Sequence, residues 1–489
     1  MSAAPGYWGD VVDDEVIFHR CPDGYCCPPQ SERCAFNHCE GNRTGTLCGD
    51  CDSHQGVQLF SPGCRAAHTC TDAAWFVPVL MVCTVLVVMS LLVHTHSSHR
   101  ETGLGDVVLF FYQVAPVAKP SPWIHTVPAM AAALQSACSL SPSGVGGSGV
   151  CLWAEMTTVQ LILVRIFFPC LLFLPLPLLF LLRRAVKVVI PSAAQWDLAL
   201  FCGVAVQIAM VAYMALSIGS LQLLQCIVID GELRLFWDAK QSCYQTWQVG
   251  PLLLLLLLLL LPACSIILLR RHDSTSQQHS ALVDSVRVQL QGGFSDQRSW
   301  WVAVQLYSRL VLAVVHVFVL DASWRALGVI SVCSTALVAN AQFRPYDLAV
   351  MRVGQNLSLF LINLLAASSF PAAAQAAAAS NIAIANEAGL EFVQLVIFLL
   401  PLVGACVIWS LLVLQPAKWG YDGLVSGWSR NAKDDLVQSN QPEVMGDTVP
   451  PSGPELEMAA LSREQNWVTI LSDESQDDVY SEEALWAHC

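Results

Sequence analysis

The sequence predicts an all-α polytopic membrane protein with about nine transmembrane helices, a small disulfide-rich extracellular neck and a disordered cytosolic tail. Three observations carry this prediction. Of the 489 residues, 55% are hydrophobic and only 13% are charged, which is too apolar for an ordinary soluble globule. The cysteines cluster before the first long apolar run, and the chain ends in an acidic segment.

Residues 1–72 form the neck. Its cysteines follow the spacing C-x4-CC-x6-C-x4-C-x8-CxxC-x12-C-x5-C, with glycine and proline throughout and no helical or alternating period. In an oxidising compartment this pattern predicts a disulfide scaffold. The candidates are Cys21, Cys26, Cys27, Cys34, Cys39, Cys48, Cys51, Cys64 and Cys70 in the neck, and Cys138, Cys151, Cys226 and Cys243 in two expected outer loops.

The stretch NRTGTLCGDCD holds two signals, a glycosylation acceptor at Asn42 and a CxxC formed by Cys48 and Cys51. A zinc ribbon needs two CxxC knuckles, and a thioredoxin-type centre needs a strand-to-helix junction. Neither context is present, so we expect disulfide scaffolding, with each cysteine bonded to a different partner. Asn356 matches the same acceptor motif but lies in an expected helix, where it should stay unmodified.

The membrane domain is expected over residues 73–414. A spanning helix needs roughly 20 predominantly apolar residues. Seven stretches meet that requirement, and two are weaker because one is short and the other carries amides. The seven are residues 74–93, 158–182, 198–221, 249–269, 301–320, 325–341 and 390–413, and the weaker two are 106–117 and 353–370. The ten leucines at 252–261 are expected only to span.

The distribution of basic residues predicts the orientation. Lys and Arg are enriched on cytoplasmic loops, and they follow the expected helices ending near residues 93, 182, 269 and 341. The opposite ends carry cysteines, so we expect an extracellular N-terminus and a cytosolic C-terminus in the plasma membrane. The first twenty residues contain no apolar core of a signal peptide, so either the first helix translocates the N-terminal tail or the chain begins upstream.

Polar residues inside the expected helices are candidates for function because burying them in lipid is costly. They are Arg165, Arg309, His316, Asn356 and Asn363. The two asparagines fall on one helical face, which either lines a hydrated path or bonds to a neighbouring helix, the commoner role. Arg309 lies about two turns into its helix, where it can reach the cytosolic interface by snorkelling. Between the helices, residues 280–300 have the spacing of an interfacial amphipathic helix.

The tail, residues 415–489, has too few apolar residues to form a core, so we expect disorder. Ser472, Ser475 and Ser481 lie among carboxylates, where an acid-directed kinase can act, although a solvated charged tail explains the same pattern. A cytosolic signalling partner would bind here.

Several classes of function are excluded. The net charge of −14, with 24 basic against 38 acidic residues, argues against binding nucleic acid. No P-loop, dinucleotide fingerprint, zincin, nucleophile-elbow or kinase motif occurs in a suitable context. We therefore expect a protein that is not an enzyme and that uses no cofactor or metal.

The order of four segments resembles a known family. The segments are GNRTGTLCGDCD, GDVVLFFYQV, CIVIDGELRLFWDAKQSC and FRPYDLAVMRVGQNLSLF. Together they are similar to the membrane-spanning C-terminal part of large surface proteins of unicellular eukaryotes, a G-protein-coupled-receptor-related group with EGF-like ectodomains. The last helices look like those of transient-receptor-potential-like proteins. The resemblance implies an EGF-like neck above a multi-helix domain, and it covers the chain from about residue 21 to 414.

Three functions follow as hypotheses. The first is a non-enzymatic receptor or sensor in which the neck meets an extracellular ligand and the tail meets a cytosolic partner. The second is a transient-receptor-potential-like cation channel or transporter with the polar residues of the later helices near the path. The third is a structural surface anchor. The odd number of neck cysteines leaves pairing with upstream residues, with Cys138 or Cys151, or with a second copy in a homo-oligomer open.

Overall fold

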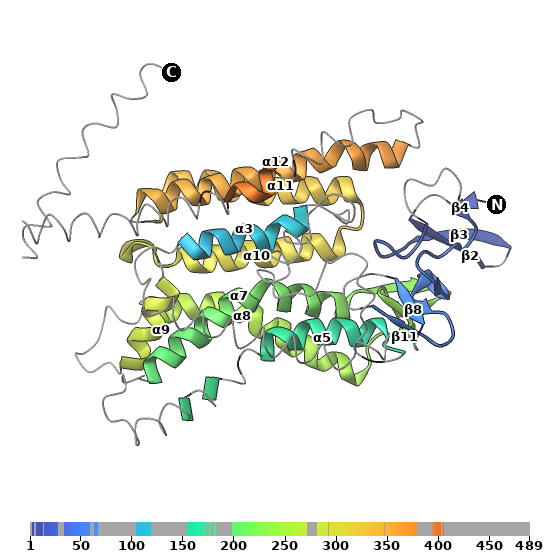
Figure 1. Ribbon diagram of the computed structural model, residues 1–489, viewed down its shortest axis with the longest axis horizontal. Helices are drawn as coiled ribbons and strands as arrows, with labels where there is room; N and C mark the ends of the chain where they lie inside the picture. The colour runs from blue at the N-terminus through green and yellow to red at the C-terminus, as the bar shows by residue number, and fades with distance from the viewer. Residues whose placement is uncertain are drawn as a thin grey trace, which may run out of the picture. The chain divides into compact units, whose positions relative to one another are not determined.

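The structure is a computed structural model that describes residues 2–58 with short gaps, 63–66, 104–118, 153–181 with gaps, 198–270, 281–378 with short gaps, and parts of 394–404. The chain divides into two units, Met1–Leu411 and Leu412–Cys489. The described residues all belong to the first unit, which contains a small β-rich neck and a set of long helices (Figure 1).

The neck is built from short antiparallel strand pairs. Its longest hairpin joins β2 (Tyr7–Val12) to β3 (Glu15–Arg20). The remaining pairs are β1 (Ser2–Ala3) with β4 (Cys34–Ala35), β5 (Arg43–Thr44) with β6 (Asp50–Cys51), and β7 (Gln55–Val57) with β8 (Cys64–Ala66). Strands this short cannot bury a sizeable core, so disulfides supply the missing constraint.

Disulfides join strands and turns throughout the neck. The described bonds pair Cys21 with Cys26, Cys39 with Cys48, and Cys51 with Cys64. Cys27 is disulfide-bonded as well. These bonds link residues that are 5 to 13 positions apart in the sequence, so each closes a short local loop.

Five of the helices that the structure describes are long and apolar enough to cross a membrane. They are α7 (Leu198–Leu224), α8 (Val249–Arg270), α10 (Trp301–Phe318), α11 (Ala322–Phe343) and α12 (Ala349–Ala378). Each coincides with an expected span. The protein is therefore mostly helical, and these helices indicate an integral membrane protein.

Two further described helices are apolar but shorter than the five long ones. The helix α3 (Leu104–Ala118) has 15 residues and α5 (Thr158–Leu171) has 14, or about 21–22 Å at the helical rise. We expected a span over residues 158–182, and α5 covers its first part, while helical residues recur at 176–177 and 180–181. Proline removes a backbone donor and clashes with the preceding turn, so Pro169, Pro175 and Pro177 favour an interrupted helix here. The expected spans at 74–93 and, for most of its length, 390–413 lie outside the described residues.

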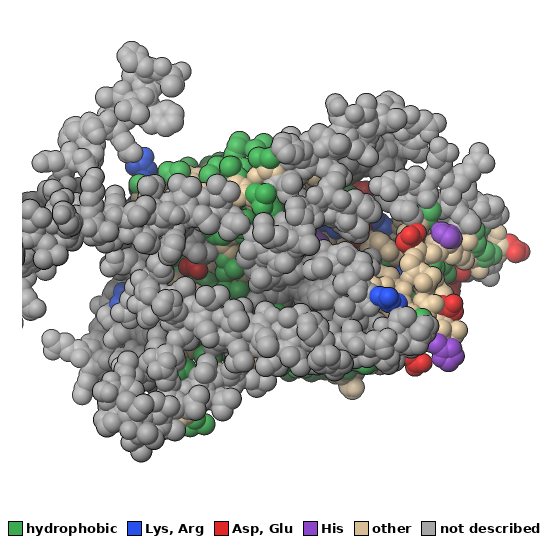
Figure 2. Space-filling model, viewed as in Figure 1, with side chains coloured by type: hydrophobic (Ala, Val, Ile, Leu, Met, Phe, Trp, Pro, Cys, Tyr) green, Lys and Arg blue, Asp and Glu red, His purple; other side chains and the backbone are tan. Residues whose placement is uncertain are grey.

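The helices pack through two apolar clusters. One joins α7 to α5, α8 and α10, and the other joins α3 to α10, α11 and α12. The leucine run of α8 packs only one face, with Leu258 buried, while Leu253, Leu257 and Leu260 are 57% to 61% exposed. Hydrophobic side chains cover much of the visible described surface of the helices (Figure 2). Exposed apolar area of this extent suits contact with lipid.

Opposite ends of the helices carry different structures. A three-stranded sheet of β9 (Cys226–Ile229), β10 (Glu232–Leu235) and β11 (Asp238–Ser242) connects α7 to α8 at one end, which we call the neck end. The disulfide between Cys226 and Cys243 closes this sheet. The amphipathic helix α9 (Ala281–Gln291) precedes α10 at the other end, which we call the α9 end. Residues 281–291 thus form the helix that their spacing predicts.

Candidate functional site

Two ion pairs join the neck to the corner between α10 and α11. Arg325 in the first turn of α11 donates from Nη1 to Oδ2 of Asp23 at 3.0 Å and from Nη2 to the carbonyl of Leu320 at 3.2 Å. Arg20, the last residue of β3, lies 3.4 Å from Asp321. The Arg325 side chain is only 5% exposed, whereas Asp23 is 47% exposed. The Asp23–Arg325 pair is therefore the more buried link between the neck and a long helix.

Asp321 has a second role at this corner. Its carboxylate accepts hydrogen bonds from the backbone N–H groups of Ser323 and Trp324, so it caps the N-terminus of α11. These hydrogen bonds, with the Arg20 guanidinium nearby, lower the pKa of the Asp321 carboxyl. A carboxylate at this position is favoured by the helix dipole. The residue that holds the neck thus also fixes where α11 begins.

A buried apolar core joins the neck to the sheet between α7 and α8. Tyr25, Leu47 and Cys48 of the neck pack with Ile229, Phe236 and Ala239 of the sheet segment, and each is 3% exposed or less. This core is shared by segments about 200 residues apart in the chain. Neither segment could bury these side chains alone, so the two stabilise each other.

Contacts continue from this core to α10. The ring of Tyr25 packs edge-on against Trp237, with centroids 6.2 Å apart. Trp237 donates to Gln225 Oε1 at 2.8 Å, and Gln225 donates to the carbonyl of Val317 in α10 at 2.9 Å. The neck is therefore connected to α10 through buried contacts as well as through the ion pairs.

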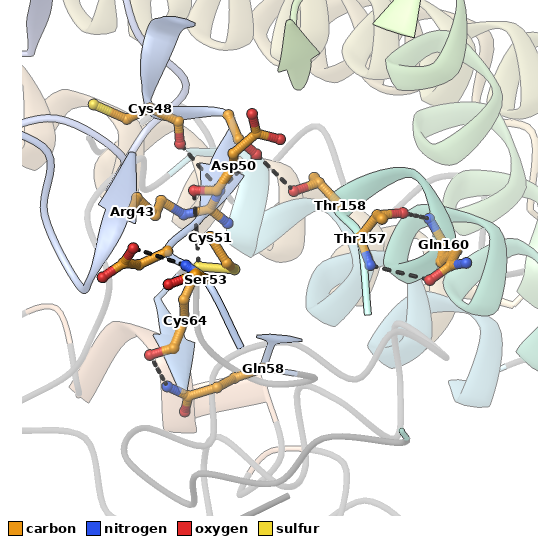
Figure 3. Close-up of a disulfide and its surroundings, with 12 residues drawn as sticks. Arg43, Cys48, Asp50, Cys51, Ser53, Gln58, Cys64, Thr157, Thr158 and Gln160 are labelled. Carbon is orange, nitrogen blue, oxygen red and sulfur yellow. Dashed lines mark hydrogen bonds between the residues drawn. A yellow bond between two sulfur atoms is a disulfide. The ribbon is translucent and has the colours of Figure 1, made fainter. Parts of the chain in front are cut away.

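The CxxC turn is held by Arg43 and contacts α5. Arg43 donates to the carbonyls of Cys48 and Gly49 at 3.2 Å, and its guanidinium carbon lies 3.5 Å from the centroid of the Tyr25 ring. Thr158, the first residue of α5, donates to the same Gly49 carbonyl at 3.5 Å (Figure 3). A Cβ on Gly49 would lie 2.9 Å from the backbone nitrogen of Ala239. The glycine therefore allows the sheet to approach.

A charged cluster lies beside this turn. Asp238 is only 2% exposed, and burial, reinforced by the nearby Asp50 carboxylate, raises its pKa from 3.8 to about 6. Arg43 and Lys240 oppose this rise, and Lys240 lies 3.6 Å from Asp50. Burial also lowers the pKa of Arg43. The contact between neck and sheet therefore contains a carboxyl group that titrates near neutral pH.

The structure describes Asn42, Cys48 and Cys51, the residues singled out in the stretch NRTGTLCGDCD. Cys48 is bonded to Cys39 and Cys51 to Cys64, so the CxxC cysteines have different partners. The Sγ atoms of Cys26 and Cys48 are 3.4 Å apart. Asn42 is exposed at positive φ in the turn before β5.

The polar residues of the helices are separated from one another. Asn356 accepts a hydrogen bond from Asn340 of α11 at 2.5 Å, which is the helix-to-helix role. Arg309 is 3% exposed and donates to the carbonyl of Met210 at 2.9 Å, so it does not reach toward solvent. Among the described residues, Arg165 Nε, His316 Nδ1 and Asn363 Oδ1 have no hydrogen-bond partner.

Several predicted residues are not placed. Cys70, Cys138 and Cys151 lie outside the described residues, as do the tail residues Ser472, Ser475 and Ser481. Cys34 begins β4, and its side chain is not described.

The sequence reasoning missed Asp23, Arg43, Asp238 and Arg325. Asp23 and Arg325 are 302 positions apart, so no local pattern connects them. A signal for the helix side was present, because Asp321 lies in the short connection between two expected spans and Arg325 begins the second of them. The sheet also had a signal in Asp230-Gly231, whose positive φ angles form the turn between β9 and β10, since Asp-Gly favours a two-residue hairpin turn.

The chain was compared with known protein families, curated proteins and solved structures. No protein-family model, curated protein or solved structure matches the chain significantly.

Proposed function

We propose that the protein is a non-enzymatic, multi-pass surface receptor or sensor in which the neck controls the ends of α10 and α11. The observation that carries this proposal is the Asp23–Arg325 ion pair, which joins the neck to the first turn of a long apolar helix at 3.0 Å. A ligand that displaces Asp23 would leave a 5% exposed guanidinium without its carboxylate. That change is costly, so it favours movement of α11.

The neck end is proposed to face the exterior of the plasma membrane. Disulfides persist in oxidising compartments, and the described disulfides lie in the neck and in the adjoining sheet. At the α9 end, four arginines lie in or beside α9 and the ends of α10, α11 and α12. They are Arg287, Arg298, Arg344 and Arg352. Arginines close to the helix ends on that side support a cytosolic α9 end.

A glycosylation assay tests this orientation. The exposed Asn42 would carry a glycan if the neck faces the exterior, so glycosidase treatment of the protein from cells should increase its gel mobility, and Asn42→Gln should abolish the shift. Asn356→Gln is the matched control, because its acceptor lies inside α12. A second measurement adds a membrane-impermeant thiol probe to the cytosolic side after the disulfides have been reduced. Labelling of the neck cysteines by this probe would contradict the orientation.

Proximity labelling in cells tests the sensor function. A labelling enzyme is fused to the C-terminus of the full chain, and the labelled proteins are compared for wild type, for Asp23→Ala and for deletion of residues 434–489. A sensor requires the deletion to remove a cytosolic partner and Asp23→Ala to change its recovery. Glu40→Ala, in a neck position with no described ion pair, is the control. Identical profiles for all variants would favour a structural anchor.

A cation channel or transporter is the second candidate. It is favoured by the buried atoms His316 Nδ1 and Asn363 Oδ1, which lie inside α10 and α12 and lack a hydrogen-bond partner among the described residues. Such groups inside a membrane suit a hydrated path. His316→Leu or Asn363→Leu should then change ionic current in a patch-clamped membrane, with Asn356→Leu as the helix-packing control. Absence of current under voltage, stretch and calcium would exclude this candidate.

A further inference from the structure

A polar cavity lies at the α9 end, between α3, α7, α9, α10 and the start of α12. Its charged and amide lining residues are Asp106, Gln207, Gln289, Gln305 and Arg309. The enclosed space is about 30 Å³ and rises to about 560 Å³ with its open mouth. An enclosed space of this size holds about two waters, so a larger molecule would enter by one end and extend outward. None of the proposed sensor contacts involves this cavity.

The two charges of the cavity have opposite sign. Arg309 is 97% buried, since only 3% of it is exposed, whereas Asp106 is exposed. Within the part of the chain that the structure describes, Arg309 donates one hydrogen bond, from Nη1 to the Met210 carbonyl, and its guanidinium carbon lies 5.4 Å from the centroid of the Phe110 ring. Among the described residues no carboxylate lies within 4.0 Å of its guanidinium. A buried cation without an ion-pair partner is costly and suits the binding of an anion.

The cavity lining also contains an unpaired donor and an unpaired acceptor. Arg309 Nε and Gln207 Oε1 are buried and have no hydrogen-bond partner among the described residues. By contrast, Gln305 already donates to the Tyr346 hydroxyl at 2.7 Å. A ligand that satisfies both open groups must bring an acceptor and a donor. A simple anion would satisfy only Arg309 and would also meet the Asp106 carboxylate.

The surroundings of the cavity are those of a membrane interface. Trp300, Trp301 and Phe343 form an aromatic cluster beside it, with ring centroids 5.4 to 6.0 Å apart. Aromatic clusters are enriched at the level of lipid headgroups. The apolar residues Leu290 and Met351 line the same cavity, and they offer a surface for the first carbons of an acyl chain.

We infer that this cavity binds a zwitterionic phosphate–ammonium group, as in the headgroup of an ethanolamine phospholipid. The phosphate oxygens accept hydrogen bonds from Arg309, and the ammonium donates to Gln207 Oε1 and to the Asp106 carboxylate. Either a membrane lipid or a soluble phosphoethanolamine carries this chemistry. The apolar lining and the aromatic cluster favour the lipid.

Native mass spectrometry of the full chain in detergent tests the inference. The chain is titrated with phosphatidylethanolamine and with phosphatidylglycerol of identical acyl chains. We expect the ethanolamine lipid to bind about tenfold more tightly, because it lacks the repulsion from Asp106 and adds a charge-assisted hydrogen bond. Free phosphoethanolamine is added as a competitor. Displacement by millimolar competitor would identify a soluble ligand, and resistance to it would identify the lipid.

Two substitutions distinguish binding from a general effect on the fold. Arg309→Gln should lower the affinity for both lipids about tenfold. Asp106→Asn, at an exposed position, should remove the preference by weakening the ethanolamine lipid and strengthening the glycerol lipid. Arg165→Gln is the matched control, because Arg165 is an intramembrane arginine outside the cavity, and it should change neither affinity.

The preference for the ethanolamine lipid over the glycerol lipid can be tested even if one variant misfolds. If Arg309→Gln fails to fold, Asp106→Asn still reports on the site, because tighter binding of one lipid together with weaker binding of the other cannot come from lost stability. Equal binding of both lipids by the wild type, or an unchanged preference in Asp106→Asn, would overturn the inference and leave a cavity that holds only water.

Discussion

The two ends of the helices are held together in different ways. At the neck end, segments about 200 to 300 residues apart are joined by a shared core and by ion pairs, and local loops are closed by disulfides. At the α9 end, the contacts join the start of α10 to the end of α11, as in the Trp300–Phe343 ring pair and the hydrogen bond from Arg298 to the Arg344 carbonyl. There a polar cavity stays open.

This difference suggests separate roles for the two ends of the helices. The neck end has many cross-links, which are the basis for the proposed transmission to α10 and α11, although Gln55 Oε1 and Arg325 Nε there are buried without a hydrogen-bond partner among the described residues. At the α9 end, Arg309 Nε and Gln207 Oε1 lack such partners beside an open cavity, which is the basis for the ligand inferred there. The following predictions test the neck end against positions elsewhere in the chain.

Loss of the Cys39–Cys48 disulfide should have the largest effect. Cys48 is fully buried in the core shared with the sheet, and removal of a disulfide from a small domain costs about 2–5 kcal/mol. Cys48→Ser should therefore speed hydrogen exchange of the neck amides about 30-fold or more. Cys264→Ser is the control, because Cys264 is a free, exposed cysteine of α8. Equal exchange in both variants would contradict a structural role for this bond.

Asp238 should make the neck less stable as pH rises. Its pKa is raised from 3.8 to about 6 in the folded protein, so the folded state binds a proton more tightly than the unfolded state. Stability is then greatest below about pH 4 and falls as pH rises through 6, by about 3 kcal/mol at most. In Asp238→Asn, the protection of the neck amides from hydrogen exchange, corrected for intrinsic rates, should no longer change between pH 4 and 7. A slope that persists in this variant would assign the titration to another group.

Breaking the buried ion pair should weaken the link to α11. Arg325→Met removes the charge and leaves Asp23 half-exposed, which should cost about 1–3 kcal/mol. Arg20→Met removes the more exposed pair with Asp321 and should cost less than about 1 kcal/mol. Hydrogen exchange at the start of α11 measures both. A larger effect from Arg20→Met would reverse the ranking of the two links.

A methyl group at Gly49 should have a small effect, close to that of Arg20→Met. The added Cβ would lie 2.9 Å from Ala239 N and 3.4 Å from Asp238 Cα, so neck and sheet must separate slightly, at a cost of about 1 kcal/mol. Gly250→Ala is the control, because a Cβ there meets nothing within 4 Å. The unfolding temperature of the full chain in nanodiscs is measured for both variants. An unchanged unfolding temperature in Gly49→Ala would show that the contact between Gly49 and Ala239 adjusts at little cost.

Much of the helical framework follows from local sequence. The five long helices coincide with expected spans because each apolar run is close to the length that a bilayer requires. Helix α9 was likewise predicted from the spacing of its apolar residues. The end of α5 at Leu171 also has a local cause in Pro169, Pro175 and Pro177.

The candidate site could be predicted only in part. The different partners of Cys48 and Cys51 match the expectation for a scaffold, yet the pairing of Cys39 with Cys48 has no signal in the spacing. Arg309 stood out as an arginine in an apolar run, but its bond to the Met210 carbonyl depends on how α7 and α10 pack. The cavity that it lines is formed by residues of five helices.

The sequence by itself determined which segments are apolar enough to cross a membrane, where cysteines gather, and which helices carry polar groups, because these properties depend on composition and on spacing along one element. Tertiary structure alone decided that Asp23 meets Arg325, that Gly49 lies against Ala239, and that Asp106, Gln207 and Arg309 line one cavity. These contacts join residues roughly 100 to 300 positions apart, and such pairs are set by the packing of whole elements, which no local pattern records.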